Sequence, residues 1–263
     1  MAEADASCRL FDPALGAALA AAKAQARGAA LRSGVTPAAL GDIEIRARAA
    51  VRNAGCASAD VATAAGRVRS AFAGYAQLRE MRYPGDAADW IAQRPPDDGV
   101  AHWRLSQRVR FGWDQMVFGI VGHGPGRGLL AVASFADGAQ PYSARLVIRD
   151  QALTVGPYIA ASQGDAHGWV PLSGRLPPRS ATRVFSAEAM SPAGRDLRPA
   201  DIKSGLAFRF PAEAMDALAA LDPREAVAVE FLFPGAGADQ VRAAYVEVGD
   251  FAAGRAFETL AAR

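Results

Sequence analysis

The first third of the chain carries apolar residues at every third or fourth position, which is the spacing of one face of an α-helix. Three polar residues suited to a helix N-cap divide this stretch: Asp12, Thr36 and Ser58. Proline follows the first two, and proline is favoured at the first position of a helix. The pattern predicts three alanine-rich helices between residues 13 and 82.

The third predicted helix has the clearest apolar face in the chain. Its apolar residues keep helical spacing for about six turns: Val61, Ala65, Val68, Phe72, Tyr75, Leu78 and Met81. The sequence Tyr-Pro-Gly-Asp at residues 83–86 should then end the helix, because proline and glycine interrupt regular structure.

The period of the pattern changes near residue 100. Residues 94–99 read Arg-Pro-Pro-Asp-Asp-Gly, which disfavours regular structure. Apolar and polar residues then alternate from His102 to Phe111, as in a strand with one buried face. We therefore predict a helical unit over residues 1–83, a linker over 84–100 and a second domain over 101–263. Proteolysis in the linker should leave a stable fragment that begins near Ala101.

Short apolar runs separated by turn residues continue through the second domain. They predict strands at residues 116–121, 129–135, 144–149, 152–155, 168–172, 182–185, 206–210, 226–233 and 241–248. Two helical patterns interrupt them, at 211–221 and at 251–262, where Asp250 is the expected cap. Strands with this spacing favour an antiparallel β-sandwich or flattened barrel. The predicted class is α+β, with a three-helix unit followed by such a β-domain with two short helices.

Cys8 and Cys56 are the only cysteines, and they flank the first two predicted helices. If these helices form an antiparallel hairpin, the two cysteines lie side by side, which predicts a disulfide. Disulfides persist in oxidising compartments, so the pair predicts a periplasmic or otherwise exported protein, although residues 1–8 do not resemble a signal peptide. The alternative is two buried thiols in a cytosolic protein. Their spacing matches no zinc site.

Composition excludes several classes of protein. Hydrophobic residues make up 51% of the chain, which is enough for a core and excludes wholesale disorder. A net charge of +2 is too small to indicate a nucleic-acid-binding protein. No run approaches the roughly 20 apolar residues that a membrane-spanning helix needs. Nearly all the cations are arginine and alanine is abundant, as a GC-rich bacterial genome produces, so a single arginine carries little functional information.

The strand predicted from His102 to Phe111 supplies the first candidate binding residues. Alternation places three arginines on its outward face: Arg104, Arg108 and Arg110. Guanidinium groups bind carboxylates and phosphates, so the row predicts contact with an acidic protein or an anionic envelope polymer. Two alternatives remain open, namely codon bias and pairing with acidic residues on neighbouring strands, such as Glu230 or Glu247.

A glycine-rich segment at residues 122–128 contains His123 and Arg127. A glycine loop that binds phosphate leads into a helix N-terminus, whereas an apolar strand pattern follows this one. The segment therefore predicts a hairpin loop. His123 and Arg127 are still candidate contacts for an anionic ligand.

Signatures of catalysis are sparse. The chain has three histidines and no G-x-S-x-G motif. His167 follows Asp165 closely, but both belong to a predicted turn. The four tryptophans lie near strand or linker ends, where core or interface anchoring is favoured over ligand stacking. We therefore predict no catalytic residue, no metal site and no cofactor.

These features together favour an exported bacterial protein that binds a ligand or assembles with a partner and catalyses no reaction. One alternative is an envelope hydrolase with His123 or His167 in a cleft between the domains. A second alternative is a cytosolic scaffold protein with free cysteines.

Overall fold

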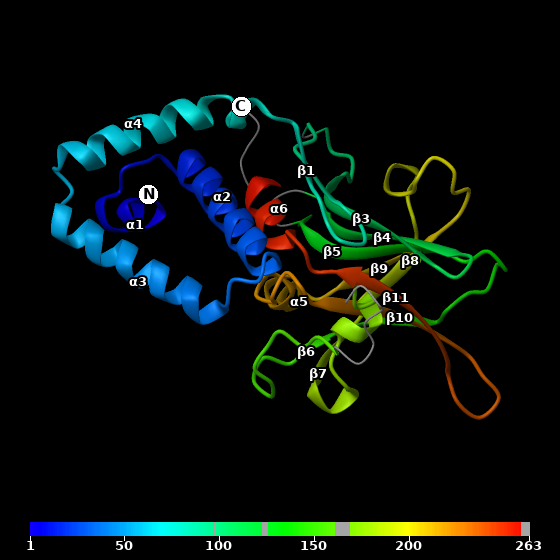
Figure 1. Cartoon of the computed structure of the whole chain (residues 1–263). Helices are drawn as coiled ribbons and strands as arrows, with labels where there is room; N and C mark the ends of the chain where they lie inside the picture. The colour runs from blue at the N-terminus through cyan, green and yellow to red at the C-terminus, as the bar shows by residue number, and fades with distance from the viewer. Residues whose placement is uncertain (97, 123–125, 161–168, 259–263) are drawn as a thin grey trace.

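The computed structural model describes residues 1–96, 98–122, 126–160 and 169–258 (Figure 1). Within these residues, helices at the N-terminus precede two antiparallel sheets of seven and four strands, which do not close into a barrel. Two further helices lie later in the chain. The predicted α+β class is therefore confirmed, with a pair of open sheets in place of a barrel.

The N-terminal region contains α1 (Ala2–Cys8), α2 (Pro13–Arg32), α3 (Pro37–Ala54) and α4 (Ala59–Ala73). All three predicted N-caps are confirmed. The side chains of Asp12, Thr36 and Ser58 accept backbone N–H groups at 2.8, 3.2 and 3.2 Å, respectively. Helix α1 was not predicted, because its seven residues are too few for a periodic pattern to be recognised.

The third predicted helix extends too far. Helix α4 ends at Ala73, and a short 3₁₀ helix, η1 (Tyr75–Gln77), leads into strand β1 (Glu80–Tyr83). Met81, expected on the helical face, pairs with Ala92 of the neighbouring strand. Apolar residues at 81 and 83 fit the alternation of a strand as well as the helical spacing, so only the pairing partner decides between the two.

The seven-stranded sheet has the order β1-β2-β3-β4-β5-β9-β8. Its other strands are β2 (Trp90–Gln93), β3 (Trp103–Phe111), β4 (Asp114–Val121), β5 (Gly128–Ser134), β9 (Leu206–Phe210) and β8 (Ala189–Pro192). The four-stranded sheet has the order β11-β10-β6-β7. It consists of β11 (Gln240–Glu247), β10 (Ala226–Phe233), β6 (Ser143–Arg149) and β7 (Thr182–Ser186). The later elements are α5 (Ala212–Ala219), α6 (Phe251–Glu258), η4 (Leu172–Arg175), η5 (Arg179–Ala181) and η6 (Arg195–Leu197).

Two expected strands are absent from the described part of the chain. Residues 152–155 form a turn, because the backbone and side chain of Asp150 accept the N–H groups of Thr154 and Ala152. In the expected strand at 168–172, residues 169–171 are irregular and Leu172 begins η4, while residue 168 lies outside the described residues. Strand β8 was not predicted.

The core lies between the two sheets and is rich in aromatic side chains. Trp90 of β2 is fully buried, its ring centroid is 5.1 Å from that of Phe251, and its Nε1 donates to the carbonyl oxygen of Glu247 at 3.0 Å. Trp90 therefore anchors the core, as favoured from the sequence. The seven-stranded sheet begins at Glu80, before the predicted linker. The division of the chain at residues 84–100 stays a prediction about which part folds independently.

Helix α2 connects the helical region to the sandwich by packing against α6 (Figure 1). Arg32 donates two hydrogen bonds to the carboxylate of Asp250, at 3.1 and 2.9 Å. Gly28 allows this approach, because a Cβ there would lie 2.6 Å from Asp250 Oδ1. The carboxylate that was expected to cap α6 therefore binds a cation from α2.

The predicted disulfide between Cys8 and Cys56 is confirmed. The bond joins the last residue of α1 to the segment after α3, and the two Cα atoms are 5.5 Å apart. A cross-link over this sequence separation restricts the unfolded chain.

Replacing both cysteines with serine should lower the free energy of unfolding by about 4 kcal/mol, the value expected from loop-closure entropy. Chemical denaturation with and without reductant measures the difference. Thiol titration of the denatured, unreduced protein should find no free thiol. Two reactive thiols in protein prepared from the periplasm would contradict the disulfide and the argument for export that rests on it.

Candidate functional site

Arg108 and Arg110 lie on the exposed side of β3, as the sequence predicts. They pair with Val117 and Gln115 of β4, whereas Val109, which lies between them, packs toward the core. Both arginines are exposed, and neither has an acidic side chain within 4 Å among the described residues. The two positions are about 6.8 Å apart along the strand, and both guanidinium groups are therefore available to an external anion.

The acidic residues considered as their partners are engaged elsewhere. Glu230 accepts hydrogen bonds from Arg145 and Arg179. Glu247 accepts backbone N–H groups from the β1–β2 connection. Neither carboxylate neutralises the arginines of β3.

The prediction that Arg104 shares this exposed face is wrong. A register shift between Trp103 and Leu105 marks a bulge in β3, and Arg104 is only 9% exposed. A bulge adds a residue to one strand and breaks the alternation of its faces. Sequence alternation cannot reveal a bulge, so the expected row of three arginines contains two.

Arg104 and Arg127 both lie near a buried carboxylate at the end of α6. Arg127 forms an ion pair with Glu258, whose side chain is 3% exposed. Burial raises the pKa of Glu258, while the nearby charges of Arg127 and Arg104 lower it. The surroundings of these two arginines are therefore different from those of the exposed pair on β3.

The histidines supply no catalytic arrangement in the described part of the chain. His102 Nε2 lies 3.0 Å from both carboxylate oxygens of Asp98. His123 and His167, on which the hydrolase alternative depends, lie outside the described residues. Residues 1–96, 98–122, 126–160 and 169–258 also contain no cluster of three or more His, Cys, Asp or Glu that would hold a metal ion.

A pocket of about 400 Å³ opens beside Arg108 and Arg110, between β3 and β11. Its lining comes from the β1–β2 connection, β3, η4 and β11: Ala87, Ala88, Gln107, Arg108, Val109, Arg110, Phe111, Gly112, Leu172, Ala243 and Tyr245. A second pocket of about 670 Å³ shares Phe111, Gly112 and Ala243 with it and continues to Trp113 and Arg242. We call the two together the β3–β11 groove.

The groove exists because β2 pairs with only the first half of β3. Its pairing with β3 ends at Ser106, opposite Ile91. Residues 86–88 precede β2 and form no strand; they donate their N–H groups to the carboxylate of Glu247, at 2.9, 2.8 and 3.4 Å. The carbonyl oxygen of Ala88 accepts Gln107 Nε2 of β3 at 3.1 Å. Among the described residues, the half of β3 that carries Arg108 and Arg110 therefore has no neighbouring strand on this side.

Gln107 closes the inner end of the groove. Its Oε1 accepts the backbone N–H of Glu247 at 3.0 Å, and its Nε2 donates to the carbonyl oxygen of Glu247 at 3.4 Å. The side-chain amide thus makes the pair of hydrogen bonds that a residue of an adjacent strand would make. In the part of the chain that the structure describes, strand β11 is the edge of its sheet, and Gln107 binds its backbone at Glu247, whose carbonyl oxygen also accepts Trp90 Nε1.

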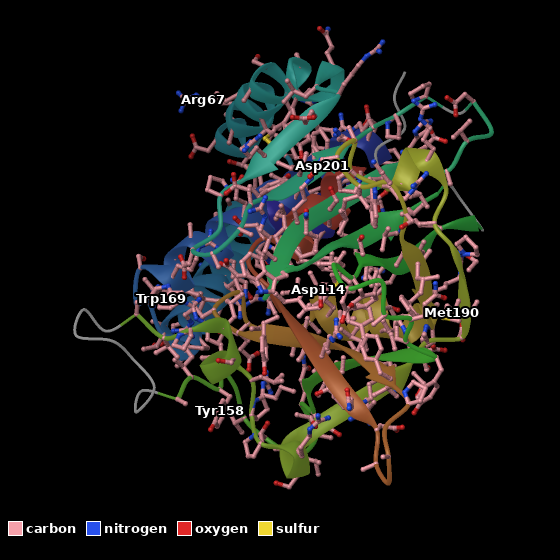
Figure 2. All side chains as sticks on the ribbon, turned by 90° about the vertical axis from the view of Figure 1, so that its right-hand side faces the viewer. Arg67, Asp114, Tyr158, Trp169, Met190 and Asp201 are labelled. Carbon is pink, nitrogen blue, oxygen red and sulfur yellow. A yellow bond between two sulfur atoms is a disulfide. The ribbon has the colours of Figure 1, made fainter. Side chains whose placement is uncertain are left out.

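The outer end of the groove lies at the β3–β4 turn. Trp113, in this turn, is 92% exposed. Asp114, labelled in Figure 2, begins β4 at this end. Arg242 of β11 donates to Asp114 at 3.1 Å and also pairs with Asp137. The hydrogen bond that Arg242 donates to the carboxylate of Asp137 lowers the pKa of Asp137 to about 2. Arg242 is thus neutralised by two carboxylates, in contrast to Arg108 and Arg110.

Sequence reasoning identified two residues of the groove and missed the rest. Gln107, Trp113 and Tyr245 were assigned to strands or turns without a role in binding. For Trp113, core or interface anchoring was favoured over ligand stacking, but its side chain is 92% exposed and does not lie in the core. The one available signal was its position in a short turn between two strand patterns.

A scan against protein-family models and searches of curated proteins and of solved structures found no match to this chain. Within the described residues, no helix is long and apolar enough to cross a membrane.

Proposed function

We propose that this protein is an exported, non-enzymatic binding module that holds an acidic partner along Arg108 and Arg110. The observation that carries the proposal is the pair of exposed guanidinium groups without carboxylate partners, beside a groove. Other arginines of the β-domain, such as Arg145 and Arg242, already have acidic partners. An acidic ligand would gain charge-assisted hydrogen bonds at β3 without displacing a carboxylate of the protein itself.

Export is the part of this proposal that rests on the disulfide. A bond between Cys8 and Cys56 is consistent with an oxidising compartment. We place the function in the cell envelope on this ground. The module would there recognise carboxylate groups of a partner protein.

Reversing the charge of both arginines, with Arg108→Glu and Arg110→Glu, should weaken retention on immobilised polyglutamate by about tenfold or more, since about 1.4 kcal/mol of lost contact corresponds to a factor of ten. Retention of the unaltered protein should fall as salt rises. The thermal midpoint should stay unchanged, because neither side chain has a partner among the described residues.

The matched control reverses Arg46 and Arg52 on α3, which are also exposed and which form no ion pair within the described residues. This variant has the same net charge as the β3 variant. It should be retained like the unaltered protein. Equal loss of retention in both variants would show that net charge alone governs binding and would refute the proposed site.

A further inference from the structure

We propose that the β3–β11 groove binds an extended acidic peptide segment of a partner protein as an added β-strand. The added strand would occupy the position beside β3 that β2 leaves empty, with acidic side chains opposite Arg108 and Arg110. This inference rests on the proposed function and specifies how the acidic partner is bound.

The open half of β3 presents backbone groups to the groove. Gly112 and Trp113 form a two-residue loop between Phe111 and Asp114, and Gly112 has φ 61°, which suits the first position of a type II′ turn. In such a hairpin, the residues that flank the loop exchange their backbone hydrogen bonds. Alternation then directs the N–H and C=O groups of Val109 toward β4.

The same alternation directs the N–H and C=O groups of Arg108 and Arg110 away from β4 and into the groove. Strand β2 does not reach these residues, since its register with β3 covers only Leu105 and Ser106. Each arginine therefore offers one donor and one acceptor from its backbone as well as its guanidinium group.

The facing edge of β11 offers the same kind of groups. Glu247 directs its backbone toward Gln107, and Val248, the next residue, donates to Glu225 on the β10 side. Alternation along β11 then directs the backbone of Tyr245 and Ala243 away from β10. Both residues line the pocket that Arg108 and Arg110 line, so an extended segment there has backbone partners on two sides.

Gln107 shows that this edge accepts a strand-like partner. Its amide group makes both hydrogen bonds to Glu247 that a peptide group of an added strand would make. The next outward positions of β11, at Tyr245 and Ala243, have no such partner in the described part of the chain. The added strand would continue the pattern that Gln107 begins.

The side chains around the groove specify what the added strand carries. Residues directly opposite each other on paired strands share a face, so positions opposite Arg108 and Arg110 favour Asp or Glu. The residue between them would share the face of Val109, which together with Phe111 and Leu172 forms an apolar lining. The expected segment is acidic–apolar–acidic, and Trp113 at the open end offers an apolar ring to the next residue.

Charge also decides against a second copy of this chain as the occupant. Pairing of β3 with another β3 would place arginines close to arginines, and like charges on paired strands repel. Charged side chains on an edge strand are a known protection against self-association. The same two arginines attract an acidic segment, so we propose a partner protein as the occupant of the β3–β11 groove.

The test uses the full chain and three acetylated, amidated peptides. The parent peptide is Thr-Glu-Val-Glu-Thr. The second peptide carries a methyl group on the backbone nitrogen of each glutamate, which removes the donors to β3 and keeps the charge. In the third peptide, lysine replaces both glutamates. Calorimetric titration should show saturable binding of the parent, at least tenfold weaker binding of the methylated peptide, and no binding of the lysine peptide.

Amide hydrogen exchange supplies a readout that charge attraction alone would not change. Bound parent peptide should slow exchange of the backbone amides of Arg108 and Arg110 at least tenfold. The amide of Val109 is the internal control, because its ladder partner lies on β4 and its exchange should not change.

The outcomes separate this inference from the proposed function. In one outcome, the methylated peptide binds as tightly as the parent, and the Arg108→Glu and Arg110→Glu variant binds neither peptide. That result supports an acidic partner and overturns strand addition. If this variant binds both peptides as tightly as the unaltered protein does, the proposed function itself fails. Absence of saturable binding of the parent at millimolar concentration overturns strand addition as well.

Discussion

Replacing Glu247 with alanine should lower the free energy of unfolding by about 3–5 kcal/mol. The residue is fully buried, and its carboxylate accepts three N–H groups from the β1–β2 connection. These hydrogen bonds are partly buried, so each donor left without a partner should cost about 1 kcal/mol, the lower end of the range for buried donors, and the lost packing of the side chain adds to this. Urea denaturation, monitored by tryptophan fluorescence, measures the loss.

The control variant is Glu247→Gln, which keeps one acceptor oxygen and nearly the same volume. Its loss should be about half that of the alanine variant, because some of the donors keep a partner. A change below about 1 kcal/mol in the alanine variant would mean that the connection does not depend on this carboxylate. The account of why the groove stays open beside β3 would then be wrong.

The structure reverses the sequence-based expectation of a stable fragment from Ala101, because β1 and β2 belong to the seven-stranded sheet. A fragment that begins at residue 101 should not unfold cooperatively, whereas one that begins at Arg79 should. The shorter fragment lacks β1 and β2, and with them the buried side chains of Tyr83 and Trp90. Loss of one buried tryptophan costs about 3–5 kcal/mol, against a total stability of about 5–15 kcal/mol for a domain. Near-ultraviolet circular dichroism and urea denaturation of both fragments provide the measurement.

The fragment from Arg79 loses the helices and keeps the whole seven-stranded sheet. Among the fully buried residues of the main core, none comes from α1 to α4, and α2 contributes only a partly buried alanine, Ala24. The stability of the fragment from Arg79 should therefore fall less than that of the fragment from residue 101. If the fragment from residue 101 unfolds at the same urea concentration as the full chain, the boundary at 84–100 is right and β1 and β2 are dispensable.

Features that depend on neighbouring residues could be predicted from the sequence. Asp12, Thr36 and Ser58 each accept an N–H group two or three residues further on, so the helix starts were correctly predicted. Strands β4 and β10 follow predominantly apolar runs and were placed within two residues of their bounds. The disulfide followed from helix geometry, because a helical hairpin brings its flanking residues together.

Features that depend on residues distant in the sequence could not be predicted from it. Met81 fits a helix and a strand equally well, and its pairing with Ala92 decides between them. Arg104 follows the alternation of β3 in the sequence, and only the ladder with β4 contains the bulge that buries it.

The sequence by itself determined the helix starts, most of the strands, the disulfide and the outward position of Arg108 and Arg110. The tertiary structure decided that these arginines border a groove, because the β1–β2 connection binds Glu247, about 160 residues away, and β2 pairs with β3 only at Leu105 and Ser106. It also decided that Gln107 closes one end, through its hydrogen bonds to the same glutamate. Local periodicity reports which face a residue occupies, whereas a binding site requires knowledge of which backbone edges remain unpaired once all the strands have found their neighbours.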